Sequence, residues 1–359
     1  MAVLTGHFDL LKKRIEPSPK RAETARDIPL KVRDYLRDHE DFITEDPHTR
    51  LAGSYGRSTA IKDIKDVDVL VFADQSWRDQ PIPDLINTLC RALKGLPEAL
   101  DDCGDVSVRK QRRSVNVYLK NHDLSLDVVP VLKTTGSHQD QVEVPDRAWD
   151  DWMFTHPLGY ACDLSALNGE NGGKVVPMIK LFKHWRDTHF QKSKPKSYWL
   201  ECLVVQHIRR GWIAAAGQGD GALFADLCAS VYERFTPYLE TDEEVPFIPD
   251  PRLRNHVAWN WKHSAFETFM RRLKDTEKWG RNAVDTSDQE MAVAYWQKVF
   301  GEDWFPSTDA VNEEYKQLGC LSAAGALFVS ATGNVATARQ TGATSVQSPP
   351  KRFFGEDGR

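Results

Sequence analysis

The stretch that decides the fold runs Leu51-Ala-Gly-Ser-Tyr-Gly-Arg57 and is followed, after eight residues, by Asp66-Val-Asp68. Valines at positions 67, 69 and 71 alternate with the residues between them, which is the pattern of a strand with one buried face. Because alternate side chains of a strand point to the same side, Asp66 and Asp68 present both carboxylates on the opposite face. The sequence therefore predicts a strand that carries two acids shortly after a glycine-containing turn.

A third acid, Asp127, lies in the run Leu124-Ser-Leu-Asp-Val-Val-Pro130, which also reads as a strand. Three carboxylates on adjacent strands would repel one another strongly unless cations lay between them. Two Mg²⁺ ions held by shared carboxylates are the usual arrangement for an in-line phosphoryl displacement, one activating the attacking hydroxyl and the other holding the triphosphate. We therefore predict Asp66, Asp68 and Asp127 as catalytic residues that bind two Mg²⁺ ions, for which Mn²⁺ could substitute.

Gly53 and Ser54 suit the phosphate end of such a site. Glycine lets the backbone approach a phosphate closely, and a serine hydroxyl with neighbouring amides can donate to the phosphate oxygens. Arg57 could approach the same phosphates from the turn, or it could be an ordinary surface residue. We keep Gly53, Ser54 and Arg57 as nucleotide-binding candidates.

The first half of the chain mixes helical and strand patterns. The first forty residues predict helices, with Ser18 and Pro19 as an N-cap and first-turn pair and with a kink or a break at Pro29. The order of elements that follows predicts an α/β (α+β) fold built on a mixed sheet and ending near Pro145. Beyond the first acidic strand, a helix is predicted at about 83–96 and strands at 105–109, 114–119 and 124–130.

Beyond Lys174 the pattern becomes helical, beginning with Val176, Ile179, Phe182 and Trp185 at helical spacing. Similar stretches follow at 198–215, 222–235 and 264–274. From Leu321 to Pro350 the only charged residue is Arg339, and this composition supports little core burial. We divide the chain into a catalytic lobe with N-terminal helices (1–155), a helical substrate-binding lobe (156–320) and a flexible tail (321–359).

Composition argues against several classes of protein. Charges interrupt the N-terminal apolar residues, and no later stretch approaches the length of a membrane span, so we expect a cytoplasmic protein without membrane attachment. Six scattered cysteines without a CxxC pair argue against a disulfide framework and a zinc knuckle. A net charge of −5 weighs against a polymeric nucleic-acid substrate, although a mononucleotide needs only a local group of cations.

Gly-Ser, eleven intervening residues and Asp-Val-Asp together resemble the signature of the DNA polymerase β-like nucleotidyltransferase superfamily, and Asp127 resembles its third carboxylate. Within that superfamily the chain is similar to the bacterial cGAS/DncV-like nucleotidyltransferases (CD-NTases), relatives of animal cyclic GMP-AMP synthase and the oligoadenylate synthetases. This resemblance implies a polymerase β-like mixed-sheet lobe and a helical lobe like that of the oligoadenylate synthetases. The segments that carry it within residues 45–306 are Trp149 with Thr155-His-Pro157, Ile179-Lys-Leu-Phe-Lys-His-Trp185, Lys196-Ser-Tyr-Trp-Leu-Glu201, Ile248-Pro-Asp-Pro251 with Asn255, and Trp296-Gln-Lys-Val-Phe-Gly301 with Trp304-Phe-Pro306.

The resemblance also implies further nucleotide contacts. By position, Lys183 would contact the donor triphosphate, Ser197 would assist it, and Tyr198 would stack on a base. A triphosphate needs cations besides magnesium, and an aromatic face stacks on any base. Lys180 lies three helical positions from Lys183 on much of the same face, so it is the second candidate.

In function, the resemblance implies synthesis of a cyclic di- or trinucleotide second messenger from nucleoside triphosphates, ATP among them, with release of pyrophosphate. It further implies a role in bacterial anti-phage (CBASS) signalling, in which the product activates a separate effector. Two alternatives stay open. One is transfer of a nucleotide to tRNA, protein or a small molecule, and the other is a catalytically inactive nucleotide-sensing scaffold.

Three remaining features bear on partners. In related systems the C-terminus of the synthase is conjugated to a target, so the tail could meet a conjugating or regulatory partner, although Arg359 is a poor match to a small terminal residue. Histidines at 156, 184 and 207 lack zinc-ligand spacing, and the zinc-bearing insertion of animal cyclic GMP-AMP synthase has no counterpart, so we expect no DNA requirement. The basic cluster of Arg109, Lys110, Arg112 and Arg113 is interpreted as a solvated tip rather than a nucleic-acid groove.

Overall fold

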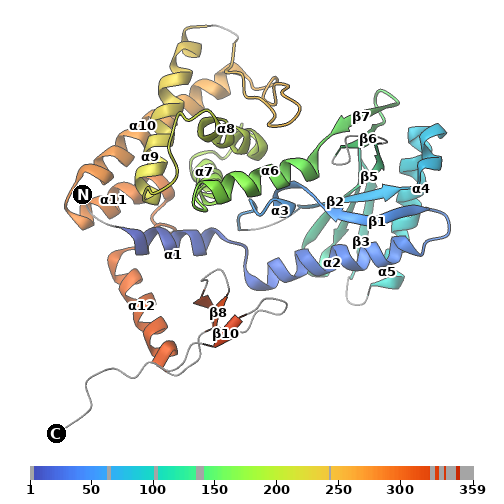
Figure 1. Cartoon of the computed structure of the whole chain (residues 1–359), viewed down its shortest axis with the longest axis horizontal. Helices are drawn as coiled ribbons and strands as arrows, with labels where there is room; N and C mark the ends of the chain where they lie inside the picture. The colour runs from blue at the N-terminus through green and yellow to red at the C-terminus, as the bar shows by residue number, and fades with distance from the viewer. Residues whose placement is uncertain are drawn as a thin grey trace.

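The structure is a computed structural model that describes residues 4–62, 66–100, 104–134, 141–241, 244–323, 328–330, 335–336 and 345–347. Figure 1 shows a sheet with its covering helices on one side of the molecule and a group of helices on the other. The mixed α/β fold predicted from the sequence is confirmed, and the helical half follows it in chain order.

Two helices begin the chain, α1 (Thr5–Ile15) and α2 (Pro19–Arg37). The hydroxyl of Ser18 accepts a hydrogen bond from the amide of Arg21, and Pro19 occupies the first turn, so the predicted N-cap is confirmed. No break occurs at Pro29, because α2 continues through it to Arg37. Pro29 is buried, and the packing of α2 along the sheet outweighs its missing N–H group.

One mixed sheet contains the strands of the first half in the order β1-β2-β5-β4-β3, with β6 pairing β5 and β7 pairing β6. The central pair, β2 and β5, is parallel, and the other pairs are antiparallel. The predicted strands β2, β3, β4 and β5 are present, whereas β1, β6 and β7 were not predicted. Their bounds are β1 Thr44–Leu51, β2 Asp66–Ala73, β3 Val106–Lys110, β4 Val115–Leu119, β5 Leu124–Lys133, β6 Val142–Asp146 and β7 Asp151–Thr155.

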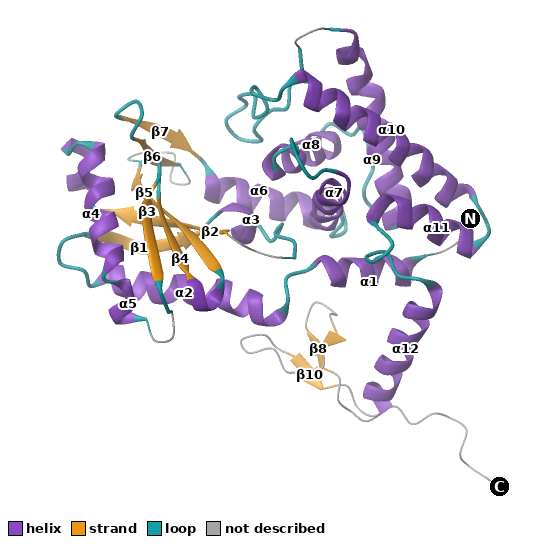
Figure 2. Cartoon of the chain, turned by 180° about the vertical axis from the view of Figure 1, so that it is seen from behind, coloured by secondary structure: helices purple, strands orange, loops and turns teal. Residues whose placement is uncertain are grey.

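The apolar face of this sheet is covered by α2 and by α4 (Ile82–Lys94), with the short α5 (Leu96–Ala99) following (Figure 2). Val67, Val69 and Val71 of β2 are fully buried in this core, as their alternation in the sequence predicts. Leu85 and Leu89 of α4 lie one helical turn apart and pack into the same cluster. The opposite face of β2 is thereby left for its polar residues.

The second half of the chain is helical and has a core of its own. Phe182 and Trp185 of α7 stack at a centroid distance of 5.1 Å, and Phe269 of α10 packs edge-on against both rings. The helix predicted from Val176 onward is confirmed as α7. The helices are α6 Pro157–Glu170, α7 Val175–His189, α8 Ser197–Arg209, α9 Asp220–Phe235, α10 His263–Asp285 and α11 Gln289–Phe300.

The first helix packs with this second core, although the predicted division grouped it with the sheet. Phe8, Leu11 and Ile15 of α1 belong to the helical cluster, and Phe8 contacts the rings of Trp296 and Phe305 edge-on. The chain therefore starts in the helical part and crosses to the sheet through α2. The division at residues 155 and 156 stays a prediction.

The last described helix is α12 (Thr308–Ala323), which continues three residues into the predicted tail. Three short strands follow it, β8 (Phe328–Ser330), β9 (Val335–Ala336) and β10 (Ser345–Gln347), in the order β10-β8-β9. The other tail residues, including the terminal peptide 348–359, lie outside the described residues. Of the helices described, none is long and apolar enough to cross a membrane.

Candidate active site

The three predicted metal ligands share the polar face of the sheet. Asp68 of β2 lies directly opposite Asp127 of β5 in the parallel register, and Asp66 lies opposite Ser125. Residues paired across neighbouring strands project to the same side. The structure therefore places Asp66, Asp68 and Asp127 on one face of the sheet.

Asp127 is held by side chains of the neighbouring hairpin. Its Oδ1 accepts hydrogen bonds from Nδ2 of Asn116 on β4, at 2.8 Å, and from Nε2 of Gln111 in the β3–β4 turn, at 3.2 Å. Asn116 is the direct cross-strand neighbour of Asp127. The hairpin thus fixes the rotamer of this carboxylate before any substrate binds.

Asp68 sits in an environment that disfavours its negative charge. Burial and the charges of Asp127 and Asp66 raise the pKa of Asp68 to about 6, against the opposing effect of Arg57. A divalent cation between these carboxylates would remove that penalty, and carboxylate oxygens are ligands that Mg²⁺ prefers.

The backbone next to Asp68 leaves room for its carboxylate only because residue 53 is glycine. Gly53 adopts a φ of +59°, and a Cβ atom built on it would lie 1.7 Å from Oδ2 of Asp68. In the described part of the chain, no three His, Cys, Asp or Glu side chains already converge on a common metal position. The shared face and the glycine cradle nevertheless fit Mg²⁺, because they let the carboxylates turn toward a common point.

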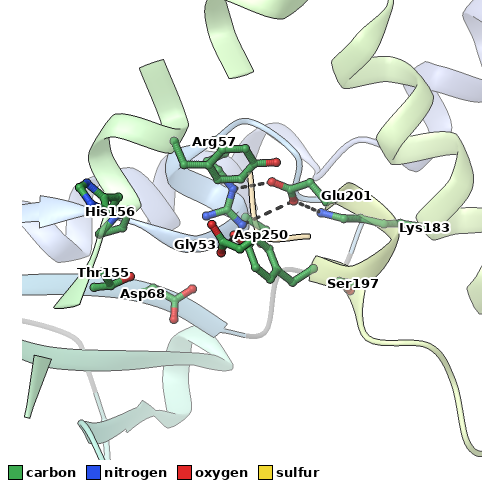
Figure 3. Close-up of a pocket in the computed structure, with 13 residues that line it drawn as sticks. Gly53, Arg57, Asp68, Thr155, His156, Lys183, Ser197, Glu201 and Asp250 are labelled. Atoms are coloured by element: carbon green, nitrogen blue, oxygen red, sulfur yellow. Dashed lines mark hydrogen bonds and ion pairs between the residues drawn. The ribbon is translucent and has the colours of Figure 1, made fainter. Parts of the chain in front are cut away.

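A cavity of about 370 Å³ opens beside Asp68, between the sheet and the helical part (Figure 3). Gly53 and Ser54 line it from the short helix α3 (Gly53–Gly56), Thr155 lines it from the end of β7, and His156 lines it from the N-cap position of α6. The predicted residues in its wall are Gly53, Ser54, Arg57, Asp68, Lys183, Ser197 and Tyr198. Asp66 and Asp127 do not line this cavity. They lie next to Asp68 on the same face of the sheet, Asp66 two residues earlier on β2 and Asp127 directly opposite on β5.

Two cations in the wall are bound to one buried carboxylate. Glu201 of α8 is completely buried, and its Oε1 accepts from Nε of Arg57 at 2.5 Å. Its Oε2 accepts from Nζ of Lys183 at 3.1 Å and from the hydroxyl of Thr59 at 3.0 Å. Although burial alone would raise the pKa of Glu201, Lys183 and Arg57 outweigh it and hold that pKa below its ordinary value. The carboxylate is therefore ionised at neutral pH.

The two candidate lysines of α7 occupy different places. Lys183 is 2% exposed and lines the cavity. Lys180 lies outside the cavity wall and forms an ion pair with Glu16, at 2.6 Å, at the end of α1. The structure thus brings Lys183, and not Lys180, to the site.

The candidate base-stacking residue, Tyr198, is held beside Arg57. Its hydroxyl donates to Oδ2 of Asp250 at 2.8 Å, and the guanidinium of Arg57 lies 5.4 Å from its ring centroid. The same guanidinium lies 5.2 Å from the ring of Tyr160, which meets Tyr198 edge-on. Ser197 accepts a hydrogen bond from Arg186 at 2.6 Å and forms part of the wall.

Two polar atoms of the wall lack a hydrogen-bond partner among the described residues, Oη of Tyr160 and Nδ1 of His156. Buried polar atoms are nearly always satisfied by protein or by ordered water, and both of these atoms belong to residues that line the cavity. Sequence reasoning missed Tyr160, Glu201 and Asp250 as site residues. Glu201 and Asp250 did stand inside segments that carry the family resemblance, whereas Tyr160 lies outside those segments.

Two of the four residues in the basic cluster on the β3–β4 hairpin form ion pairs within the protein. Arg112 and Arg113 both pair with Asp146 of β6, at 2.6 and 2.7 Å, and Asp146 has no exposed surface. Arg112 also lies over the ring of Trp149 at 4.7 Å. These contacts tie the hairpin to the β6–β7 turn and therefore help to position Gln111 and Asn116 at Asp127.

Comparison with known proteins agrees with this geometry. Residues 1–168 match the family model of the Second Messenger Oligonucleotide or Dinucleotide Synthetase domain. A cyclic AMP-AMP-AMP synthase of an Acinetobacter strain is 29% identical over 339 residues, which cover 91% of each chain. These similarities agree with the resemblance of the sequence to the bacterial cGAS/DncV-like nucleotidyltransferases (CD-NTases).

Two further similarities are to proteins of Escherichia coli MS 115-1. A curated cyclic AMP-AMP-AMP synthase of that strain is 24% identical over 306 residues, covering 79% of this chain and 90% of the relative. The solved structure of CdnC with ATP superposes with a TM-score of 0.64 and 20% identity, covering 84% of this chain and 98% of CdnC. At that identity the superposition shows a shared fold.

Proposed function

We propose that this protein is a CD-NTase, a Mg²⁺-dependent synthase that joins nucleoside triphosphates into a cyclic oligonucleotide and releases pyrophosphate. The observation that carries the proposal is the row of Asp66, Asp68 and Asp127 on one sheet face, with Asp68 in the wall of a cavity that also holds Arg57 and Lys183. Carboxylates for metal ions beside cations for a triphosphate are what nucleotidyl transfer needs.

Within the cavity, the donor nucleotide has a place for each of its parts. The turn at Gly53 and Ser54 lets the backbone approach the phosphates, and Arg57 supplies a cation above them. The ring of Tyr198 gives the base a face to stack on. When bound at the three aspartates, Mg²⁺ would lower the pKa of the attacking hydroxyl and neutralise charge on the triphosphate.

The cyclic product and the choice of base are supported by the relatives. Two of them, 29% and 24% identical to this chain, are cyclic AMP-AMP-AMP synthases. We therefore propose ATP as the substrate and a cyclic tri-adenylate as the product. A role in CBASS anti-phage signalling follows as a proposal from the same relationship.

A product assay tests the proposal directly. Purified protein is incubated with ATP, or with all four nucleoside triphosphates, and Mg²⁺ or Mn²⁺, then treated with phosphatase and examined by mass spectrometry. We expect a phosphatase-resistant product with the mass of three linked adenylates. Asp68→Asn should reduce its yield by about 100-fold or more while the protein stays folded, because the substitution removes a metal ligand but keeps the shape of the side chain.

The same assay separates the alternatives. Transfer of label from α-labelled ATP to tRNA or to protein, without a resistant small product, would replace the proposal by nucleotidyl transfer to those acceptors. Mg²⁺-dependent binding of ATP without turnover, at any pH and with either metal, would favour an inactive nucleotide-sensing scaffold. A resistant product of another mass or base would correct only the choice of cyclic tri-adenylate.

A further inference from the structure

The buried carboxylate of Glu201 joins the two parts of the molecule at the cavity. Arg57 and Thr59 belong to the segment that links α3 to β2, whereas Lys183 and Glu201 belong to α7 and α8. All four side chains meet through hydrogen bonds of 2.5 to 3.1 Å (Figure 3 draws the three charged ones). Glu201 is therefore the anion on which groups from both sides converge.

The hydrogen bonds of this cluster leave few donors free. The three N–H donors of Lys183 match three acceptors: the carbonyl and the hydroxyl of Thr59, at 3.0 and 2.9 Å, and Oε2 of Glu201, at 3.1 Å. Arg57 donates from Nε and from one terminal nitrogen to Glu201, and its second terminal nitrogen donates to no residue that the structure describes. Arg57 therefore keeps one N–H group that can donate to a ligand in the cavity, whereas the N–H groups of Lys183 are all used within the protein.

One carboxylate between two cations leaves the cluster with a net positive charge. We propose that Glu201 is a positioning residue, a built-in counter-anion that keeps Lys183 protonated and aims Arg57 into the cavity, so that a nucleoside triphosphate meets a preformed cationic site. This inference rests on the proposed nucleotide site and adds to it the group that prepares its cations.

The reason lies in what Lys183 would experience without Glu201. Burial lowers the pKa of Lys183, and attraction to Glu201 offsets only part of that effect. The other charged groups that face Lys183 are Arg57 and Arg186, and both lower its pKa further. With Glu201 made neutral, the pKa of Lys183 would fall further, and above that pKa nucleotide binding would be coupled to the uptake of a proton from solvent.

This coupling produces a signature in the pH dependence of binding. When binding requires uptake of one proton, the dissociation constant rises by about tenfold per pH unit above the pKa of the group. Glu201→Gln should therefore bind a nucleoside triphosphate with a non-cleavable α–β bridge more weakly than wild type at pH 7, and the difference should grow between pH 7 and pH 9. Wild type should show little change over the same range.

Two further variants complete the experiment. Glu201→Asp keeps the charge and should restore most of the flat pH profile, even if the shorter side chain weakens binding. Asp220→Asn is the matched control, because Asp220 is also a buried carboxylate between two lysines, Lys12 at 2.7 Å and Lys174 at 2.6 Å, but lies outside the nucleotide cavity. It should lower stability without changing nucleotide affinity or its pH profile.

The outcomes decide the matter in either direction. A Glu201→Gln protein with the wild-type pH profile, or a Glu201→Asp protein that behaves like Glu201→Gln, would overturn the proposal. If Glu201→Gln does not fold, calorimetry of wild type at pH 8 in buffers of different ionisation enthalpy replaces it. Nucleotide binding should then take up no proton, and uptake of one proton would show that Glu201 does not keep Lys183 charged.

The readout is nucleotide binding and not product. A wild-type protein that binds the triphosphate analogue but makes no cyclic product would contradict the proposed function while leaving the role of Glu201 intact. Conversely, a productive enzyme whose binding ignores the charge at position 201 would contradict only the positioning role.

Discussion

At the scale of single residues, the contact between Gly53 and Asp68 is the tightest constraint in the site. The backbone of residue 53 adopts a left-handed φ of +59°, and the carboxylate of Asp68 occupies the volume where a Cβ atom would stand. Glycine is thus required twice, once by its conformation and once by the space above it. This contact joins the carboxylate that we propose to bind metal to the turn that we propose to approach the phosphates.

Replacing Gly53 with alanine tests this coupling. We expect Gly53→Ala to reduce product formation by about 100-fold or more, because displacing Asp68 by about 1 Å is enough to misalign a reacting group. Gly172→Ala is the matched control, since Gly172 has a φ of +63° but no atom within 4 Å of its added Cβ. That control should cost about 1 kcal/mol of stability and leave activity intact. Equal activity loss in both variants would show that backbone strain alone matters.

What the sequence reveals at this scale is local. Asp66 and Asp68 are two residues apart on one strand, so their common face follows from period two without knowledge of the fold. Glu201 gave no such signal, because its partners Arg57 and Lys183 lie 144 and 18 residues away in the chain. An acid on a helix reads as a surface residue until tertiary structure buries it.

At the scale of elements, strands were predicted where their faces differ and missed where they do not. β2 alternates between buried valines and acids, so the sequence predicts both the strand and which of its side chains share a face. β1 has only one buried position in eight and contains Pro47, so its sequence reads as a loop. It is a strand because the edge of β2 offers it a pairing partner, and no local pattern contains that information.

The β3–β4 hairpin is the element whose anchoring can be tested. Hydrogen bonds from Arg112 and then Arg113 hold the pKa of Asp146 well below its ordinary value. Asp146→Asn should lower the free energy of unfolding at pH 7 on the order of 1–2 kcal/mol, a modest loss because both arginines are about half exposed. It should also reduce activity, since Gln111 and Asn116 on this hairpin hold Asp127.

The pH dependence of that difference has a definite sign. A carboxyl group with a depressed folded pKa contributes stability that is present above its unfolded pKa and is lost as pH falls through the folded value. The difference in urea unfolding between wild type and Asp146→Asn should therefore stay unchanged from pH 7 to about pH 5, and the two proteins should converge only as the pH is lowered from about 4 toward 2. Asp226→Asn, which removes a surface pair with Arg281, should change stability little at any pH. A gap for Asp146→Asn that stays constant down to about pH 2 would contradict the ionic explanation.

At the scale of the whole molecule, separate hydrophobic clusters flank one cavity. The sheet cluster is built by α2, α4 and the strands, and the helical cluster by α1 and the helices from α6 onward. The division into a mixed sheet and a helical half could be read from periodicity. The cavity could not, because its shape depends on how the two clusters sit against each other, which is set by contacts such as Arg57 with Glu201.

The end of the described chain offers a test of how far the folded unit extends. Val311 of α12 is 6% exposed, Glu314 pairs with Lys13 of α1, and Tyr315 lies against Gly6. Among residues 306–317, none belongs to a hydrophobic cluster. A chain that stops after Ala323 should therefore keep the unfolding midpoint and the product yield of the full chain.

A chain that stops after Pro306 should behave differently, because it loses the whole of α12. Removing the buried side chain of Val311 and uncovering part of α1 should cost about 1–3 kcal/mol of stability. Since Phe8, Leu11 and Ile15 anchor α1 in the helical core, the damage should appear as a lower melting temperature of that core, with residual activity at low temperature. Thermal unfolding of both truncations beside the full chain checks this, and equal stability of the two would show that α12 does not support α1.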